Sequence, residues 1–291
     1  MIFPEFPNPS PSQAFVVYLL FGLLAGSFVN VVVYRLPIML NRQWQIETRH
    51  FLGLLRDPRD ATGKTFNLVR PRSHCPQCKR AIKPLELIPV FSYLLLRGKC
   101  ACRERAISLR YPLVELLCGS LAGLLALLFG AGWLTLALLL FSLVLVALAL
   151  IDYENQLLPD VLTLPLLWTG LLLNALFPDL LGTGAADAII GAAAGYLLLG
   201  GFHYAYYLLT GREGMARGDF KLLAAMCAWL GWTALPFIVL ASSLTGAVWG
   251  VTLVLIRGRS WSQPLPFGPF LAAAGFAVML AGPDRLVGWL G

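Results

Sequence analysis

Two aspartates stand at the ends of apolar runs, where a pair of carboxylates could do acid–base chemistry. Asp152 closes the run that ends at Ile151, and Asp219 opens the run that begins at Phe220. Two carboxylates at close range cannot both ionise easily, so one can activate water while the other protonates a leaving group. That is the chemistry of an aspartic peptidase. Helix capping or an interface role would explain the spacing equally well, and both interpretations stay open at this point.

A second group of reactive residues consists of two close cysteine pairs separated by about twenty residues. Four thiolates suit a tetrahedral zinc site, and a short loop domain has too little core to order itself without such a staple. We therefore expect a structural Zn²⁺ whose ligands are Cys75, Cys78, Cys100 and Cys102. His74 is a reserve ligand, because the second pair has only one intervening residue. Disulfides are the alternative, which a reducing cytoplasm disfavours.

The hydropathy of the chain indicates which elements must position these residues. Of the 291 residues, 58% are hydrophobic and 13% are charged, and the mean hydropathy of +0.74 excludes a soluble globular protein. Uncharged runs of about twenty residues, long enough to cross a bilayer as helices, recur along the chain. The predicted fold class is an all-α polytopic membrane protein of about eight helices. Their expected spans are 13–34, 111–129, 133–151, 160–178, 188–209, 219–233, 236–256 and 267–283.

The basic residues predict the orientation of these helices. The net charge is +7, and 21 of the 22 lysines and arginines fall in inner loops if the N-terminus lies outside. The positive-inside rule then gives external termini and a cytoplasmic first loop that carries the cysteines. Asp152 and Asp219 both lie at the cytoplasmic edge of the bilayer in this topology. The basic surplus is therefore a topology signal, and we expect a lipid bilayer but no nucleic acid as a partner.

The order of several motifs extends this interpretation to nearly the whole chain. Besides the cysteine pairs they are Gly26–Val32, Arg35–Pro37, Arg110–Glu115, Ile151–Asp160, Gly214–Lys221 and Pro266–Pro269. In this order they resemble the type IV prepilin peptidases, bacterial inner-membrane enzymes of pilus and type II secretion systems. The resemblance implies that Asp152 and Asp219 are catalytic and that the four cysteines belong to a zinc-binding cytoplasmic domain.

The resemblance also implies the substrates and a second activity. Members of this family remove the short basic leader from prepilins or pseudopilins after a glycine, and many then methylate the new N-terminus with S-adenosylmethionine. The expected location is the inner membrane, with the active site at the cytoplasmic face and periplasmic termini. The expected domains are a first transmembrane helix (1–34), a cytoplasmic cysteine-containing domain (35–110) and a seven-helix membrane peptidase domain (111–291).

The chain departs from the family pattern in two places. The family's Gly-x-Gly-Asp motif reads Ala216-Arg217-Gly218-Asp219, and an alanine at a position that needs positive φ would cost about 1 kcal/mol and could shift Asp219. The second cysteine pair lacks one of the usual two intervening residues.

An ion-coupled membrane transporter and a non-catalytic zinc-organised assembly scaffold are the alternative functions. The sequence indicates neither the oligomeric state nor a binding site for S-adenosylmethionine.

Overall fold

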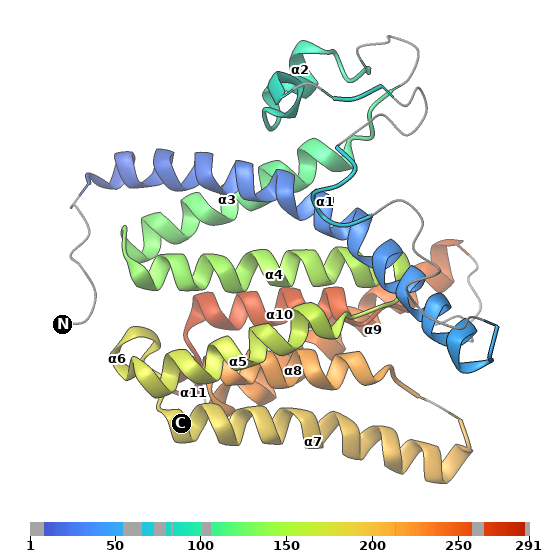
Figure 1. Ribbon diagram of the computed structural model, residues 1–291. Coiled ribbons are helices and arrows are strands. Elements are labelled where there is room, and N and C mark those ends of the chain that lie inside the picture. Colours follow the sequence, from blue (N-terminus) through green and yellow to red (C-terminus); the bar gives the residue numbers. More distant parts are fainter. Residues whose placement is uncertain are drawn as a thin grey trace. The chain divides into compact units, whose positions relative to one another are not determined.

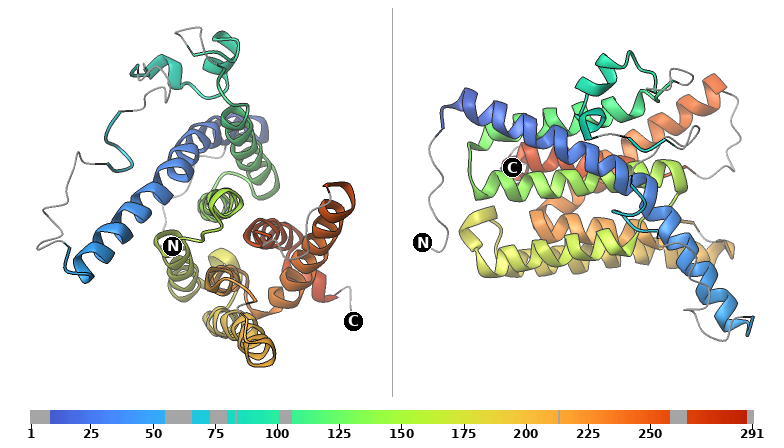
Figure 2. Two further views of the ribbon diagram at one scale, coloured as in Figure 1. Left: turned by 90° about the vertical axis from the view of Figure 1, so that its right-hand side faces the viewer. Right: turned by 45° about the horizontal axis from the view of Figure 1, so that its top comes forward.

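The computed structural model shows a helical protein (Figures 1 and 2), and its described residues contain no β-strand. The chain forms two compact units, Met1–Leu143 and Val144–Gly291, which are treated separately below. The residues outside the described part of the structure are 1–8, 55–65, 73–79, 83, 101–105, 213, 258–264 and 289–291.

The first unit is built on two closely packed helices. The long helix α1 (Pro11–Phe51) packs along α3 (Arg110–Phe129), and α4 (Trp133–Asn155) begins in this unit. The connection between α1 and α3 contains the short helices η2 (Pro84–Leu87) and α2 (Phe91–Leu95). Glycine allows the close approach of α1 to α3: a Cβ added at Gly22 would lie 2.5 Å from Ala122 Cβ.

Helix α1 is longer than the predicted membrane span, which ended at residue 34. The prediction ended the segment at the first basic residue, but a charge ends an apolar span without ending a helix. Arg35 continues the helix and is only 6% exposed, because its guanidinium donates to the carbonyl oxygens of Asn67 (2.9 Å) and Pro71 (2.8 Å). The beginning of the predicted cytoplasmic domain, residues 35–51, is therefore helix.

The second unit contains the end of α4 and the remaining helices. The longer ones are α5 (Asp160–Leu176), α7 (Ala185–Thr210), α8 (Arg217–Leu230), α9 (Leu235–Arg257) and α10 (Gly268–Ala281). Short helices α6 (Pro178–Leu181), η3 (Trp232–Ala234) and α11 (Pro283–Gly288) lie beside them. Helix α8 forms the core of the unit: it packs against α5, α7 and α10, and its residues from Leu222 to Leu230 are all buried.

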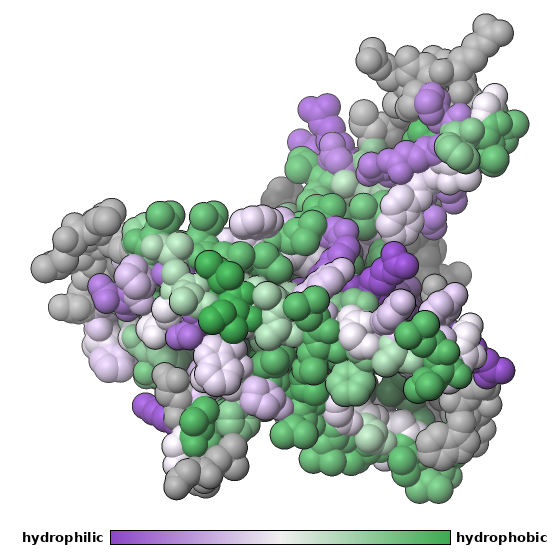
Figure 3. All heavy atoms as spheres, turned by 90° about the horizontal axis from the view of Figure 1, so that it is seen from below, coloured by the Kyte–Doolittle hydropathy of each residue, from purple (hydrophilic) through white to green (hydrophobic). Residues whose placement is uncertain are grey.

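The predicted membrane segments all coincide with helices of the structure. Within the described residues, five helices are long and apolar enough to cross a membrane: α1, α3, α4, α7 and the stretch Trp232–Ile256. Helices α5 and α10 are apolar but shorter. Apolar side chains cover much of the face seen in Figure 3, which suits contact with lipid. The chain is thus a polytopic helical membrane protein, and the crossing of the bilayer by eight helices stays a prediction.

Candidate active site

Both predicted aspartates lie in the second unit, at the ends of two different helices. Asp152 lies in the last turn of α4 and Asp219 in the first turn of α8. Figure 1 shows these two helix ends on the same side of the unit, at its right-hand edge. Asp152 is 6% exposed and Asp219 is 4% exposed, and the charge of Asp152 acts directly on Asp219. The structure therefore buries both carboxylates and brings Asp219 within reach of the charge of Asp152.

A third helix end fixes the orientation of one carboxylate. Gly268 is the first residue of α10, and its backbone N–H donates to Asp152 Oδ2 at 2.9 Å. The first N–H groups of a helix have no partner within the helix, so this donor is available. A Cβ added at Gly268 would lie 2.8 Å from the same Oδ2 atom. Glycine at this position therefore lets the amide reach the carboxylate.

Gly268 was not identified as a site residue from the sequence. The signal was present in Pro266-Phe267-Gly268-Pro269, where a glycine between prolines opens an apolar run. That pattern predicts a helix start with an unused backbone donor, but it does not identify the acceptor. The acceptor lies 116 residues earlier in the chain, so only the tertiary fold reveals the bond.

The turn before Asp219 is also shaped by close packing. A Cβ added at Gly218 would lie 2.7 Å from Leu158 Cβ, which belongs to the turn between α4 and α5. Ala216 has φ −73° and ψ 139°, an extended conformation open to any residue. The condition for strain at this alanine, a positive φ, is therefore not met. The second glycine of the motif is the one whose missing side chain matters here.

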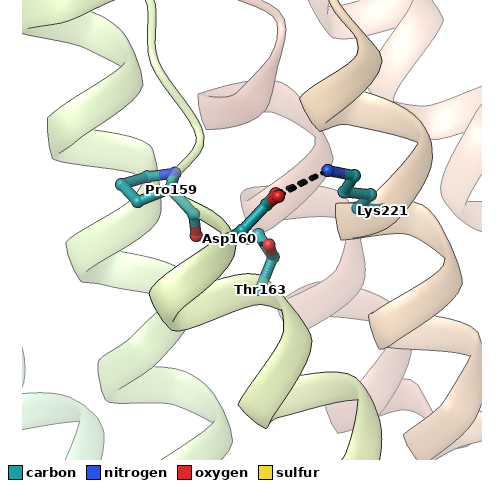
Figure 4. A network of polar contacts seen from close by, with 4 residues as sticks. All are labelled: Pro159, Asp160, Thr163 and Lys221. Atoms are coloured by element: carbon teal, nitrogen blue, oxygen red, sulfur yellow. Dashed lines mark hydrogen bonds and ion pairs between the residues drawn. The ribbon is translucent and has the colours of Figure 1, made fainter. Parts of the chain in front are cut away.

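An ion pair ties α8 to α5 next to Asp219 (Figure 4). Lys221 Nζ lies 2.7 Å from both Oδ1 and Oδ2 of Asp160, the first residue of α5. In the same turn, Thr163 Oγ1 donates to the Pro159 carbonyl oxygen at 3.2 Å. The side chain of Asp160 is 53% exposed, so the pair contributes at most about 1 kcal/mol. Its geometry nevertheless holds the helix starts of α5 and α8 side by side.

The predicted zinc ligands lie mostly outside the described residues. This applies to Cys75, Cys78, Cys102 and the reserve ligand His74, whereas Cys100 is described and half-buried. Lys99 forms an isolated antiparallel bridge with Ala106, and the Ile107 N–H donates to the Gly98 carbonyl oxygen at 2.7 Å. The residues on either side of the segment 101–105 are thus paired. In the described part of the chain, no three His, Cys, Asp or Glu residues gather into a metal-binding group.

Comparisons with known proteins agree with the sequence motifs. Residues 20–129 match the family model of the bacterial peptidase A24 N-terminal domain, and residues 139–251 match that of the type IV leader peptidase family. A prepilin leader peptidase/N-methyltransferase from Aeromonas salmonicida is 50% identical over 98% of this chain and 96% of its own length. The protein of the same name from Pseudomonas aeruginosa is 50% identical over 91% of this chain and 89% of its own length. The one from Neisseria gonorrhoeae is 44% identical over 92% of this chain and 91% of its own length. No solved structure matches the chain.

Proposed function

Because this chain belongs to the type IV leader peptidase family, we propose that it cleaves the leader from prepilins with Asp152 and Asp219 as its catalytic carboxylates. The observation that carries the assignment is the burial of both carboxylates, one in the last turn of α4 and one in the first turn of α8, with the charge of Asp152 acting on Asp219. The relatives described above are all named as peptidases, so the transporter and scaffold alternatives are not retained.

The geometry supports hydrolysis by general acid–base catalysis. One carboxylate takes a proton from water as the water oxygen attacks the peptide carbonyl carbon, and the other gives a proton to the departing amine. The bond from Gly268 commits Oδ2 of Asp152, so this carboxylate presents its other oxygen to the reaction. Both acids are buried, so the proton transfers take place in a site shielded from bulk solvent.

The predicted topology gives the substrate a consistent path. A prepilin with a basic leader in the cytoplasm and an apolar helix in the bilayer would place its scissile bond at the depth of Asp152 and Asp219. We therefore place the enzyme in the bacterial inner membrane with both termini periplasmic. Type II secretion pseudopilins share this chemistry and are the second expected substrate class.

Two glycine-related substitutions test the motif that presents Asp219. Gly218→Ala pushes α8 away from Leu158, so we expect leader cleavage to fall by at least about tenfold as Asp219 moves. Ala216→Gly restores the family pattern without removing strain, so cleavage stays within about twofold and unfolding shifts by less than about 1 kcal/mol. Cleavage rates on one prepilin measure both. A large gain from Ala216→Gly would contradict the extended backbone at that residue.

We also propose that Cys75, Cys78, Cys100 and Cys102 hold a structural Zn²⁺. The donor set fits this ion, since four thiolates complete a tetrahedral shell. Cys100 directly follows Lys99, which pairs with Ala106.

Metal content of the purified protein tests the zinc site. Cys78→Ser should lower bound zinc from about one ion per chain to a small fraction, because three thiolates leave the shell open. Cys118→Ala is the matched control, since Cys118 is buried in α3, and it should keep the metal. Equal zinc content in Cys78→Ser and the unmodified protein would remove these cysteines as ligands.

Methylation of the new N-terminus is the second activity we propose. Its support is the name of the relatives, which are N-methyltransferases as well as peptidases. S-adenosylmethionine would supply the methyl group. Labelled S-adenosylmethionine and a cleaved pilin, incubated with the purified protein, should give labelled pilin, and no transfer to a properly cleaved substrate would remove this half of the assignment.

A further inference from the structure

The connection between α1 and α3 contains an apolar segment, residues 84–96, that was not predicted as a membrane element. It carries one acid, Glu86, and no lysine or arginine. It is too short to cross a bilayer, which takes about twenty residues. The structure folds it into η2 and α2, yet leaves six of its large apolar side chains exposed: Leu85 (76%), Leu87 (44%), Ile88 (40%), Phe91 (54%), Leu94 (66%) and Leu95 (67%).

A buried carboxylate fastens this segment to a helix that is long and apolar enough to cross the membrane. The Val90 N–H donates to Glu115 Oε2 at 2.8 Å, and the side chain of Ser27 on α1 also bonds to Glu115. Glu115 is 9% exposed and lies five residues after Arg110, the first residue of α3. At a rise of 1.5 Å per residue, Glu115 lies about 7 Å along the helix axis from the first residue of α3. The segment is therefore fixed to the side of α3, and Figure 1 shows α2 next to the first turns of that helix.

The chain turns sharply at both ends of α2. Val90, just before the helix, has φ 60°, a conformation that β-branched residues rarely adopt. After the helix, Arg97 and Gly98 also have positive φ, and the Gly98 N–H donates to the Tyr93 carbonyl oxygen at 2.9 Å. The Glu115 bond holds the strained end in place. Helix α2 is thus bounded by sharp turns on both sides and attached to α3 at its first end.

The charges around the segment fit an anionic membrane surface. Its single acid, Glu86, is neutralised by Arg80 at 2.9 Å. Arg97 and Lys99 are exposed where α2 ends. An apolar face with basic residues at its edge is the pattern of an element that lies in the lipid interface. Continuity with α3 points the same way, since Leu113 (60% exposed) and Leu117 (47% exposed) on that helix present further apolar surface.

We propose that residues 84–96 form an interface anchor, which inserts the side chains of Phe91, Leu94 and Leu95 into the bilayer while Arg97 and Lys99 contact anionic lipid headgroups. The anchor lies between the two cysteine pairs in sequence. It therefore holds the cysteine-containing connection against the membrane at a point other than α1 and α3.

Photo-crosslinking of the full chain tests the anchor without any measurement of catalysis. Benzoylphenylalanine replaces Leu94, and the protein is irradiated in nanodiscs of phosphatidylethanolamine and phosphatidylglycerol. The control position is Leu54, which is 72% exposed and follows the end of α1, far along the helix from its apolar part. We expect lipid adducts at Leu94 in several-fold excess over Leu54. Adducts with a second copy of the chain or with added prepilin in place of lipid, or adducts at the Leu54 level, would overturn the proposal.

Two further variants separate the apolar part from the charged part. With the probe at Phe91, the double substitution Leu94→Glu and Leu95→Glu should lower the lipid adduct yield several-fold, because charges resist insertion. Removing phosphatidylglycerol should lower the yield for the unmodified anchor but not for the double variant Arg97→Gln and Lys99→Gln. If removing phosphatidylglycerol left the adduct yield unchanged in the unmodified protein as well as in the double variant, the headgroup contact would be refuted. None of these outcomes depends on leader cleavage, so they are independent of the peptidase assignment.

Discussion

Asp152→Asn and Asp219→Asn are each expected to reduce leader cleavage by roughly 10²–10⁴-fold, the range that follows when a general acid or base is removed. Asparagine keeps an acceptor oxygen for the Gly268 N–H, so the substitution at Asp152 leaves that hydrogen bond possible. The loss then reports chemistry and not the collapse of the helix ends. The measurement is the rate at which purified variant in detergent or nanodiscs converts a prepilin to its mature form.

A matched control separates this effect from a general loss of acidic residues. Asp179 lies in the first turn of α6 and is exposed, so Asp179→Asn should cleave at close to the unmodified rate. Thermal unfolding of all three variants should stay within a few degrees of the parent. Cleavage at the normal rate by either Asp152→Asn or Asp219→Asn would end the dyad proposal, whatever the family.

Gly268→Ala is expected to lower kcat by about 10²-fold with a smaller change in KM. The added methyl group would lie 2.8 Å from Asp152 Oδ2, so either the carboxylate or α10 must move. The hydrogen bond from the backbone N–H of residue 268 to Oδ2 is then lost. A displacement of about 1 Å at a reacting group is enough for a loss of this size. The displaced carboxylate acts in the chemical step of the proposed mechanism, so kcat should carry most of the effect.

Gly246→Ala is the control for this substitution. Gly246 lies in α9, and a Cβ there would meet the Phe267 and Phe270 rings at 3.6 Å, an ordinary contact distance. Both variants therefore add a methyl group to one of two neighbouring helices, but only the methyl group at residue 268 clashes with its surroundings. Equal kcat values for Gly268→Ala and the parent would show that the hydrogen bond from this backbone N–H does not position Asp152.

The sequence predicted the elements well because each depends on local composition. Apolar runs of helical length identified every segment that became a long helix of the second unit, and Asp152 and Asp219, which end and begin two of those runs, lie within reach of each other's charge. Charge was less reliable as a boundary. Arg35 ended the predicted span, but the carbonyl oxygens that satisfy its guanidinium come from Asn67 and Pro71, which no local pattern reveals.

The features missed from the sequence are contacts between residues far apart in the chain. The Gly268 amide meets Asp152 only after α10 has packed, and Glu115 meets Val90 only after the connection has folded back onto α3. The apolar segment 84–96 was overlooked for a different reason: with thirteen residues it falls below the length that a search for membrane-crossing runs requires. A short interfacial element is recognised by the exposure of its apolar side chains and by its attachment to a neighbouring helix, and both are visible only in the structure.

The Gly268–Asp152 bond also bears on when the protein becomes active during its synthesis. Asp152 and Asp219 are both translated well before α10, whose first residue is Gly268. A nascent chain that already holds both acids therefore lacks the amide that orients one of them. We therefore expect the chain to gain cleavage activity only after α10 has been synthesised and has packed beside α8, and to be inactive while it is still bound to the ribosome.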